Sequence, residues 1–250
     1  MKLLTFILGF VLTTNTISVE AQQVVDTTSR RNTIKLDFTS YALYRNAAVL
    51  SYERVVKSNQ TWGVTGGFQQ LPGLIKGISS VQVTKNAKAS GFKVGGEYRF
   101  YLQKENKFNA PRGVYMGPYT TLLNFSNQRF VQLDNNGVVE EGSLRTKVNI
   151  VNIGFQVGYQ FLVNDRWTFD LVFVGPSISN YRATVQLEGN INIDPDNISD
   201  EISEALLNRF PLIGDLISGN TISSSGKANT WGFGYRYQFQ VGYHFGRKNK

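Results

Sequence analysis

The stretch Trp231–Phe245 reads WGFGYRYQFQVGYHF, and it alternates without a break between large apolar residues and glycine or polar residues. Successive side chains of an extended strand point to opposite faces, so the odd-numbered positions form one face of aromatic residues and a valine. A strand in a globular protein averages about 5–6 residues, and a soluble sheet has no place for an aromatic ridge of this length. The stretch therefore predicts a transmembrane β-strand whose aromatic face contacts lipid.

Two further segments, 92–103 and 151–161, repeat this pattern, with large apolar residues on one face and glycine, polar or charged residues on the other. Five more segments show it less regularly. They are Asn32–Leu43, Asn46–Val56, Thr61–Gln69, Gly113–Phe125 and Trp167–Ser177. The eight segments predict an all-β fold, an eight-stranded antiparallel transmembrane β-barrel that spans residues 32–246.

The connections between these segments alternate in length, as periplasmic turns and extracellular loops do in bacterial outer-membrane barrels. The shorter connections are Lys57–Gln60, Val163–Arg166 and Gln103–Arg112, and the longer ones are 70–87, 127–145 and 179–228. Tyr44–Arg45 is an exception, because it is a tight turn on the side expected to carry long loops.

The composition argues against several other classes of protein. The 250 residues include no cysteine and one histidine, which excludes a disulfide scaffold, a zinc–thiolate site and a multi-histidine metal centre. The net charge of +8 is scattered along the chain, and no basic run carries interleaved aromatic residues. Nucleic-acid binding is therefore not expected.

The first 21 residues have the order of a secretory signal peptide, with Lys2, the apolar run Leu3–Leu12 and then Val19-Glu20-Ala21. The run is too short to span a membrane as a helix. We expect export and cleavage after Ala21, a periplasmic segment at 22–31 and a basic tail at 247–250. The expected location is the outer membrane of a Gram-negative bacterium.

Eight charged residues of the predicted strands lie opposite the apolar faces, and four of them are acids and four are bases. This mixture suits a closed polar lumen, where the charges would form a structural network of ion pairs. A soluble barrel of the lipocalin type would have the reverse arrangement, an apolar interior and a polar exterior. The predicted network comprises Lys35, Asp37, Glu53, Lys93, Glu97, Arg99, Asp170 and Arg236.

No catalytic, cofactor or metal site is predicted. His244 falls on the lumen face, where we interpret it as a polar lumen residue, because glycine occupies the next position on that face. The alternatives are an outer-membrane enzyme acting on lipid or peptide, with His244 as general base, and a soluble periplasmic ligand-binding barrel. An ion path or catalytic carboxylate pair among the lumen charges is a further alternative to the structural network.

The segment 179–228 contains an acidic stretch that does not match a calcium-binding loop, because Pro195 interrupts it. Apolar residues follow at helical spacing, and Pro211 ends the run. A short amphipathic helix is therefore expected in the last extracellular loop, where it caps the barrel or binds a partner. Its apolar positions include Ile198, Ile202, Leu206 and Phe210.

The chain resembles the small, mostly uncharacterised outer-membrane β-barrel proteins of Bacteroidetes. The resemblance covers nearly all of the chain after residue 21, and it implies a fold and a location but no activity. The stretches that carry it are Asn32–Leu36 with Asn46 and Glu53, Glu97–Tyr101 with Gly113–Tyr119, and Gly154–Gln160 before Trp167. The insertion 179–228 departs from the family pattern, as does the tail that follows the terminal aromatic residue Phe245.

These observations predict a structural or surface-binding protein with a filled polar lumen and no catalysis. Its expected partners are outer-membrane lipid, the barrel-assembly machinery and an extracellular molecule that binds through residues 179–228.

Overall fold

The computed structural model describes residues 30–71, 82–106, 108–135, 138–189 and 227–246. The predicted signal peptide at 1–21 and the basic tail at 247–250 lie outside the described residues. The predicted loop helix with Ile198, Ile202, Leu206 and Phe210 also lies outside them.

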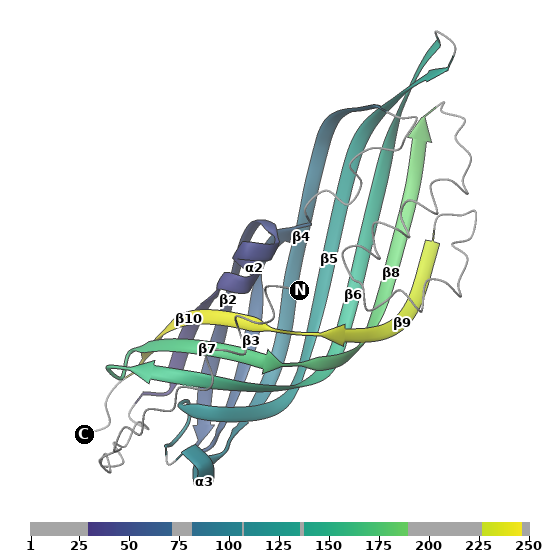
Figure 1. The fold of residues 1–250 in the computed structure, drawn as a ribbon. Helices are drawn as coiled ribbons and strands as arrows, with labels where there is room; N and C mark the ends of the chain where they lie inside the picture. The colour runs from purple at the N-terminus through teal and green to yellow at the C-terminus, as the bar shows by residue number, and fades with distance from the viewer. Residues whose placement is uncertain (1–29, 72–81, 107, 136–137, 190–226, 247–250) are drawn as a thin grey trace, which may run out of the picture.

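The described residues form one antiparallel sheet that closes on itself (Figure 1). Its strands are β1 (Asn32–Asp37), β2 (Arg45–Lys57), β3 (Gln60–Gln70), β4 (Gln82–Tyr101), β5 (Gly113–Asn135), β6 (Val138–Val163), β7 (Trp167–Val174), β8 (Pro176–Gly189), β9 (Lys227–Tyr235) and β10 (Gln238–Phe245). The closed ring runs β1-β2-β3-β4-β5-β6-β7-β10 and returns to β1. The structure thus confirms the predicted eight-stranded antiparallel barrel.

Strands β8 and β9 continue two strands of the ring beyond short breaks. β6 pairs with β7 at its C-terminal end and with β8 over Gly142–Gly154, so β7 and β8 form one line that is broken at Gly175. β9 and β10 form a second line, broken at Arg236 and Tyr237. The two breaks lie side by side, because the backbone N–H of Arg236 donates a hydrogen bond to the Gly175 carbonyl oxygen (2.7 Å).

The two ends of the barrel differ. We call one the turn end, where the connections 58–59, 102–112 and 164–166 lie together with the short helix α3 (Gln103–Asn106). At the opposite end, the extended end, strands β4, β5, β6 and β8 continue well past the closed ring (Figure 1).

Burial alternates along the strands, and the buried side chains include charged and polar residues as well as apolar ones. Lys35, Glu53 and Arg99 are fully buried in the lumen, whereas the outward-facing Ile153 and Trp231 are 64% and 60% exposed. The alternation persists through Trp231–Phe245 despite the break at residues 236 and 237. This distribution is the reverse of that in a soluble protein, where charged residues are almost never fully buried.

The prediction that Asn32–Leu43 forms a single strand is wrong. β1 ends at Asp37, and helix α2 (Phe38–Leu43) follows. The Asp37 carboxylate caps this helix by accepting hydrogen bonds from the Ser40 backbone N–H (3.0 Å) and hydroxyl (2.7 Å). Neither helix in the described part of the chain is long and apolar enough to cross a membrane.

The three predicted long linkers are also corrected. Residues 82–87 of the predicted linker 70–87 belong to β4. Most of 127–145 forms the outer part of the β5–β6 hairpin, which is paired as far as Asn135 and Val138. Residues 179–189 of the predicted loop 179–228 belong to β8. Apolar and polar residues do not alternate regularly along 127–145, so hydrophobic periodicity does not reveal the backbone pairing there.

Candidate functional site

The charged residues of the lumen come from four strands, β1, β2, β4 and β7, and from the break between β9 and β10, which carries Arg236. Small residues opposite them leave room for their side chains. Gly63 on β3 is paired with both Glu53 and Glu97. A Cβ atom at Gly63 would lie 3.1 Å from Oε1 of Glu97. Gly242 is opposite Lys35 in the same way. Long charged side chains therefore reach the barrel axis at these levels.

Four of the charged residues form the centre of the network. The Lys35 ammonium contacts Glu53 (2.7 Å) and Asp170 (2.6 Å). The Arg99 guanidinium contacts Asp170 (2.6 Å) and, less closely, Glu53 (3.7 Å). All four side chains are buried, so each charge depends on its partners for the interactions it would otherwise make with water.

The other four charged residues extend the network toward the extended end. Glu97 links the centre to the break between β9 and β10, because its two carboxylate oxygens contact Arg99 (2.6 Å) and Arg236 (3.2 Å). Lys93 pairs with Asp37 (2.8 Å), the cap of α2. The structure therefore brings together all eight residues proposed from the sequence, with four acids opposed to four bases.

Uncharged residues that the sequence-based proposal left out complete the centre. Tyr115 donates a hydrogen bond to Asp170 (2.6 Å), and its ring lies 4.2 Å beneath the Arg99 guanidinium. Tyr101 donates to Glu53 (3.0 Å). The Gln160 amide oxygen accepts from Lys35 (2.8 Å) and Arg99 (3.1 Å). Tyr101 lies two residues after Arg99 on β4, so strand alternation places both side chains on the same, lumen-facing side.

His244 lies near the turn end and is only 1% exposed. Its Nδ1 atom is 2.9 Å from the Thr33 hydroxyl oxygen, and its backbone N–H donates to the Arg166 carbonyl oxygen (2.6 Å). These contacts hold the imidazole in the lumen wall, which is where strand alternation placed it.

A cavity of about 520 Å³ lies above the network, toward the extended end. Its wall includes the apolar side chains of Leu43, Leu123, Ile150 and Phe233. Its floor lies at the level of Asp37. The lumen is therefore filled by side chains only in the part of the barrel nearer the turn end. Among the described residues, no group of three or more metal-ligating side chains is present here or elsewhere.

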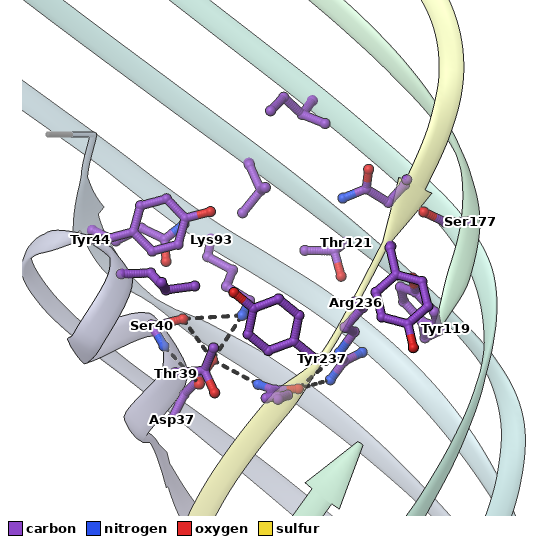
Figure 2. Close-up of a pocket in the computed structure, with 18 of the residues that line it drawn as sticks. Asp37, Thr39, Ser40, Tyr44, Lys93, Tyr119, Thr121, Ser177, Arg236 and Tyr237 are labelled. Atoms are coloured by element: carbon purple, nitrogen blue, oxygen red, sulfur yellow. Dashed lines mark hydrogen bonds and ion pairs between the residues drawn. The ribbon is translucent and has the colours of Figure 1, made fainter. Parts of the chain in front are cut away.

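The floor of the cavity is cationic. Lys93 and Arg236 line it with side chains that are 15% and 14% exposed, whereas their partners Asp37 and Glu97 are 0% and 5% exposed. Figure 2 shows Lys93 directed toward Asp37 and Ser40, and Arg236 beside Tyr119, whose ring centre is 4.8 Å from the guanidinium carbon. Glu97 does not line the cavity, and Asp37 lines it with a fully covered side chain, so the exposed charge at the floor is positive.

Comparisons with known proteins give a family but no activity. No curated protein and no solved structure matches the chain. The family model described as Protein of unknown function (DUF3575) matches residues 10–182, which include the strands that contribute seven of the eight network residues. Because this match covers more than half of the 250 residues, the chain belongs to the DUF3575 family.

Proposed function

We propose that the protein is an outer-membrane β-barrel with a structural or surface-binding role and no catalytic activity. The observation that carries the proposal is the inverted distribution of side chains, with charged residues buried in the lumen and large apolar residues exposed around the outside. Water solvates such an exterior poorly, whereas the hydrocarbon core of a membrane matches it.

A belt of aromatic residues around the turn end supports this location. Tyrosine and tryptophan concentrate where a membrane protein crosses the interface between lipid and water. The hydroxyls of Tyr52 and Tyr98 donate to Asn32 (2.6 Å) and Gln60 (2.9 Å) at the rim, so each ring faces outward with its polar end toward the turns. The ring pairs of the belt are Tyr52–Trp62, Tyr98–Phe100, Tyr159–Phe161 and Trp167–Tyr243.

The proposed location in a Gram-negative outer membrane also agrees with the resemblance to barrels of Bacteroidetes and with the sequence pattern of residues 1–21. On this proposal the turn end faces the periplasm and the extended end faces the outside. The recognition surface for an extracellular partner would then lie in the region 179–228, and lipid and the assembly machinery would contact the barrel wall.

We expect the full-length protein to fractionate with outer membranes and to migrate on a gel according to its folding state. A closed barrel resists dodecyl sulfate until heated, so unheated and boiled samples should run at different positions. Recovery in the soluble periplasmic fraction, with identical mobility before and after boiling, would replace the proposal with the soluble binding barrel.

We also expect no stable conductance steps when the purified protein is inserted into planar bilayers. An eight-stranded barrel is just wide enough for its own side chains, and the lumen near the turn end is filled by the charge network. A 16-stranded porin measured in the same bilayers provides the positive control. Reproducible conductance steps from the protein alone would show that the barrel forms an open pore, and they would contradict the structural role proposed for the charge network.

A further inference from the structure

We propose that the cavity above the charge network binds a single-chain amphiphile with a carboxylate head, of the fatty acid class. This inference goes beyond the proposed function, and it uses the membrane location only for the route by which the ligand arrives. The cavity of about 520 Å³ falls within the range of about 300–1,000 Å³ that is typical of small-molecule sites.

The interior of the barrel changes character along its axis, and the cavity lies at the change. Toward the turn end the buried side chains include the charged and polar residues of the network. Toward the extended end they include Leu123, Phe125, Val148 and Ile150, all of which are buried. Leu123 and Ile150 line the cavity, as do Thr121 and Asn152, so a ligand there meets aliphatic and aromatic side chains interspersed with polar groups, and the charged floor at one end.

The polar end of the cavity favours an anion. Lys93 and Arg236 are the network residues whose side chains reach the cavity with exposed surface. Asp37 also lines the cavity but its side chain is fully covered, and Glu97 does not line it. A carboxylate head can accept charge-assisted hydrogen bonds from both cations without displacing Asp37 or Glu97. A cationic head would instead face two like charges.

Gln69 adds a second observation that points to a ligand. Its side chain lines the cavity and is fully buried, yet neither its amide nitrogen nor its amide oxygen has a hydrogen-bond partner among the described residues. An unpaired buried amide costs free energy, and a polar ligand group offers it a partner.

The barrel wall beside the cavity is interrupted. β10 is paired with β1 only as far as Gln240 and Asp37, and within the described strands β9 is paired with β8 alone. Helix α2 takes the place of a longer β1, and its Thr39 hydroxyl accepts a hydrogen bond from the Phe239 backbone N–H (2.7 Å). Within the part of the chain that the structure describes, the side of the cavity between α2 and β9 thus lacks a continuous hydrogen-bonded wall, which gives a flexible acyl chain a lateral entrance from the proposed lipid phase.

The test measures binding to the full-length barrel in neutral maltoside micelles by native mass spectrometry, with a thermal-shift measurement in parallel. The probes are dodecanoate, dodecanol, dodecyltrimethylammonium and acetate. We expect a saturable one-to-one adduct with dodecanoate and a higher melting temperature. Dodecanol should bind at least about tenfold more weakly because it lacks the charge, and the cationic amphiphile and acetate should give no saturable adduct.

A matched pair of variants on β5 tests the location. Leu123→Trp fills the cavity, whereas Leu122→Trp places the same side chain on the outer face of the barrel. Dodecanoate binding should be lost in the first variant and kept in the second, and Lys93→Met should weaken it about tenfold. Equal binding in both tryptophan variants, or equal binding of dodecanoate and dodecanol, would overturn the proposal. So would the absence of a saturable adduct with the wild-type barrel, whatever the fractionation experiment shows.

Discussion

Replacing Arg99 with alanine is expected to lower the free energy of unfolding by about 3–5 kcal/mol, because removal of one partner leaves an uncompensated charge in a buried network. Arg99 is fully buried and contacts Glu97, Asp170 and Glu53. Its loss leaves the four acids of the network opposed to three bases. Urea unfolding of the barrel in detergent, followed by tryptophan fluorescence and gel mobility, measures the change.

Two further variants separate charge from packing. Arg99→Met keeps most of the side-chain volume and should destabilise nearly as much as alanine if the lost charge dominates. Arg54→Ala removes an exposed arginine from β2 and should change the unfolding free energy by no more than about 0.5 kcal/mol. A stable Arg99→Met variant would contradict the interpretation that these ion pairs hold the lumen together.

The sequence predicted the barrel where both faces of a strand have a defined environment. Trp231–Phe245 alternates in exposure over its whole length because one face is polar lumen and the other is apolar exterior. The prediction failed at 127–145, where apolar and polar residues do not alternate regularly along the hairpin. Strand pairing there depends on the neighbouring chain segment, which composition does not show.

The same reasoning placed the charge network but not the cavity. Strand parity was enough to place Arg99 and Asp170 in one lumen, because each lies opposite the apolar face of its own strand. The cavity depends on where β1 ends. Asp37 was recognised as a lumen charge, but it is also the N-cap of α2, a role for which aspartate followed by Ser40 carried a signal. Because Asp37 matched the pattern of a lumen charge, its second role as a helix cap was not recognised from the sequence.

The close approach of Tyr115 to the backbone of β6 leads to the second large prediction. Tyr115 lies opposite Gly158, and a Cβ atom at Gly158 would meet the Tyr115 hydroxyl and lie 2.5 Å from the Leu171 carbonyl oxygen. Gly158→Ala should therefore displace the ring that supports Arg99 and donates to Asp170.

We expect Gly158→Ala to cost about 1–3 kcal/mol through overpacking, and about 1.5–3 kcal/mol more if the hydrogen bond to the charged Asp170 is broken. Gly66→Ala on β3 is the matched control, because a Cβ atom there has no neighbouring atom within 4 Å. A methyl group added at that outward-facing position should be neutral, or should stabilise by up to about 1 kcal/mol through the unfolded chain. Urea unfolding of the two alanine variants under the same conditions provides the comparison. Equal destabilisation would point to a general intolerance of alanine in these strands, whereas a loss confined to Gly158 would show that this glycine is required by the tyrosine that completes the charged lumen.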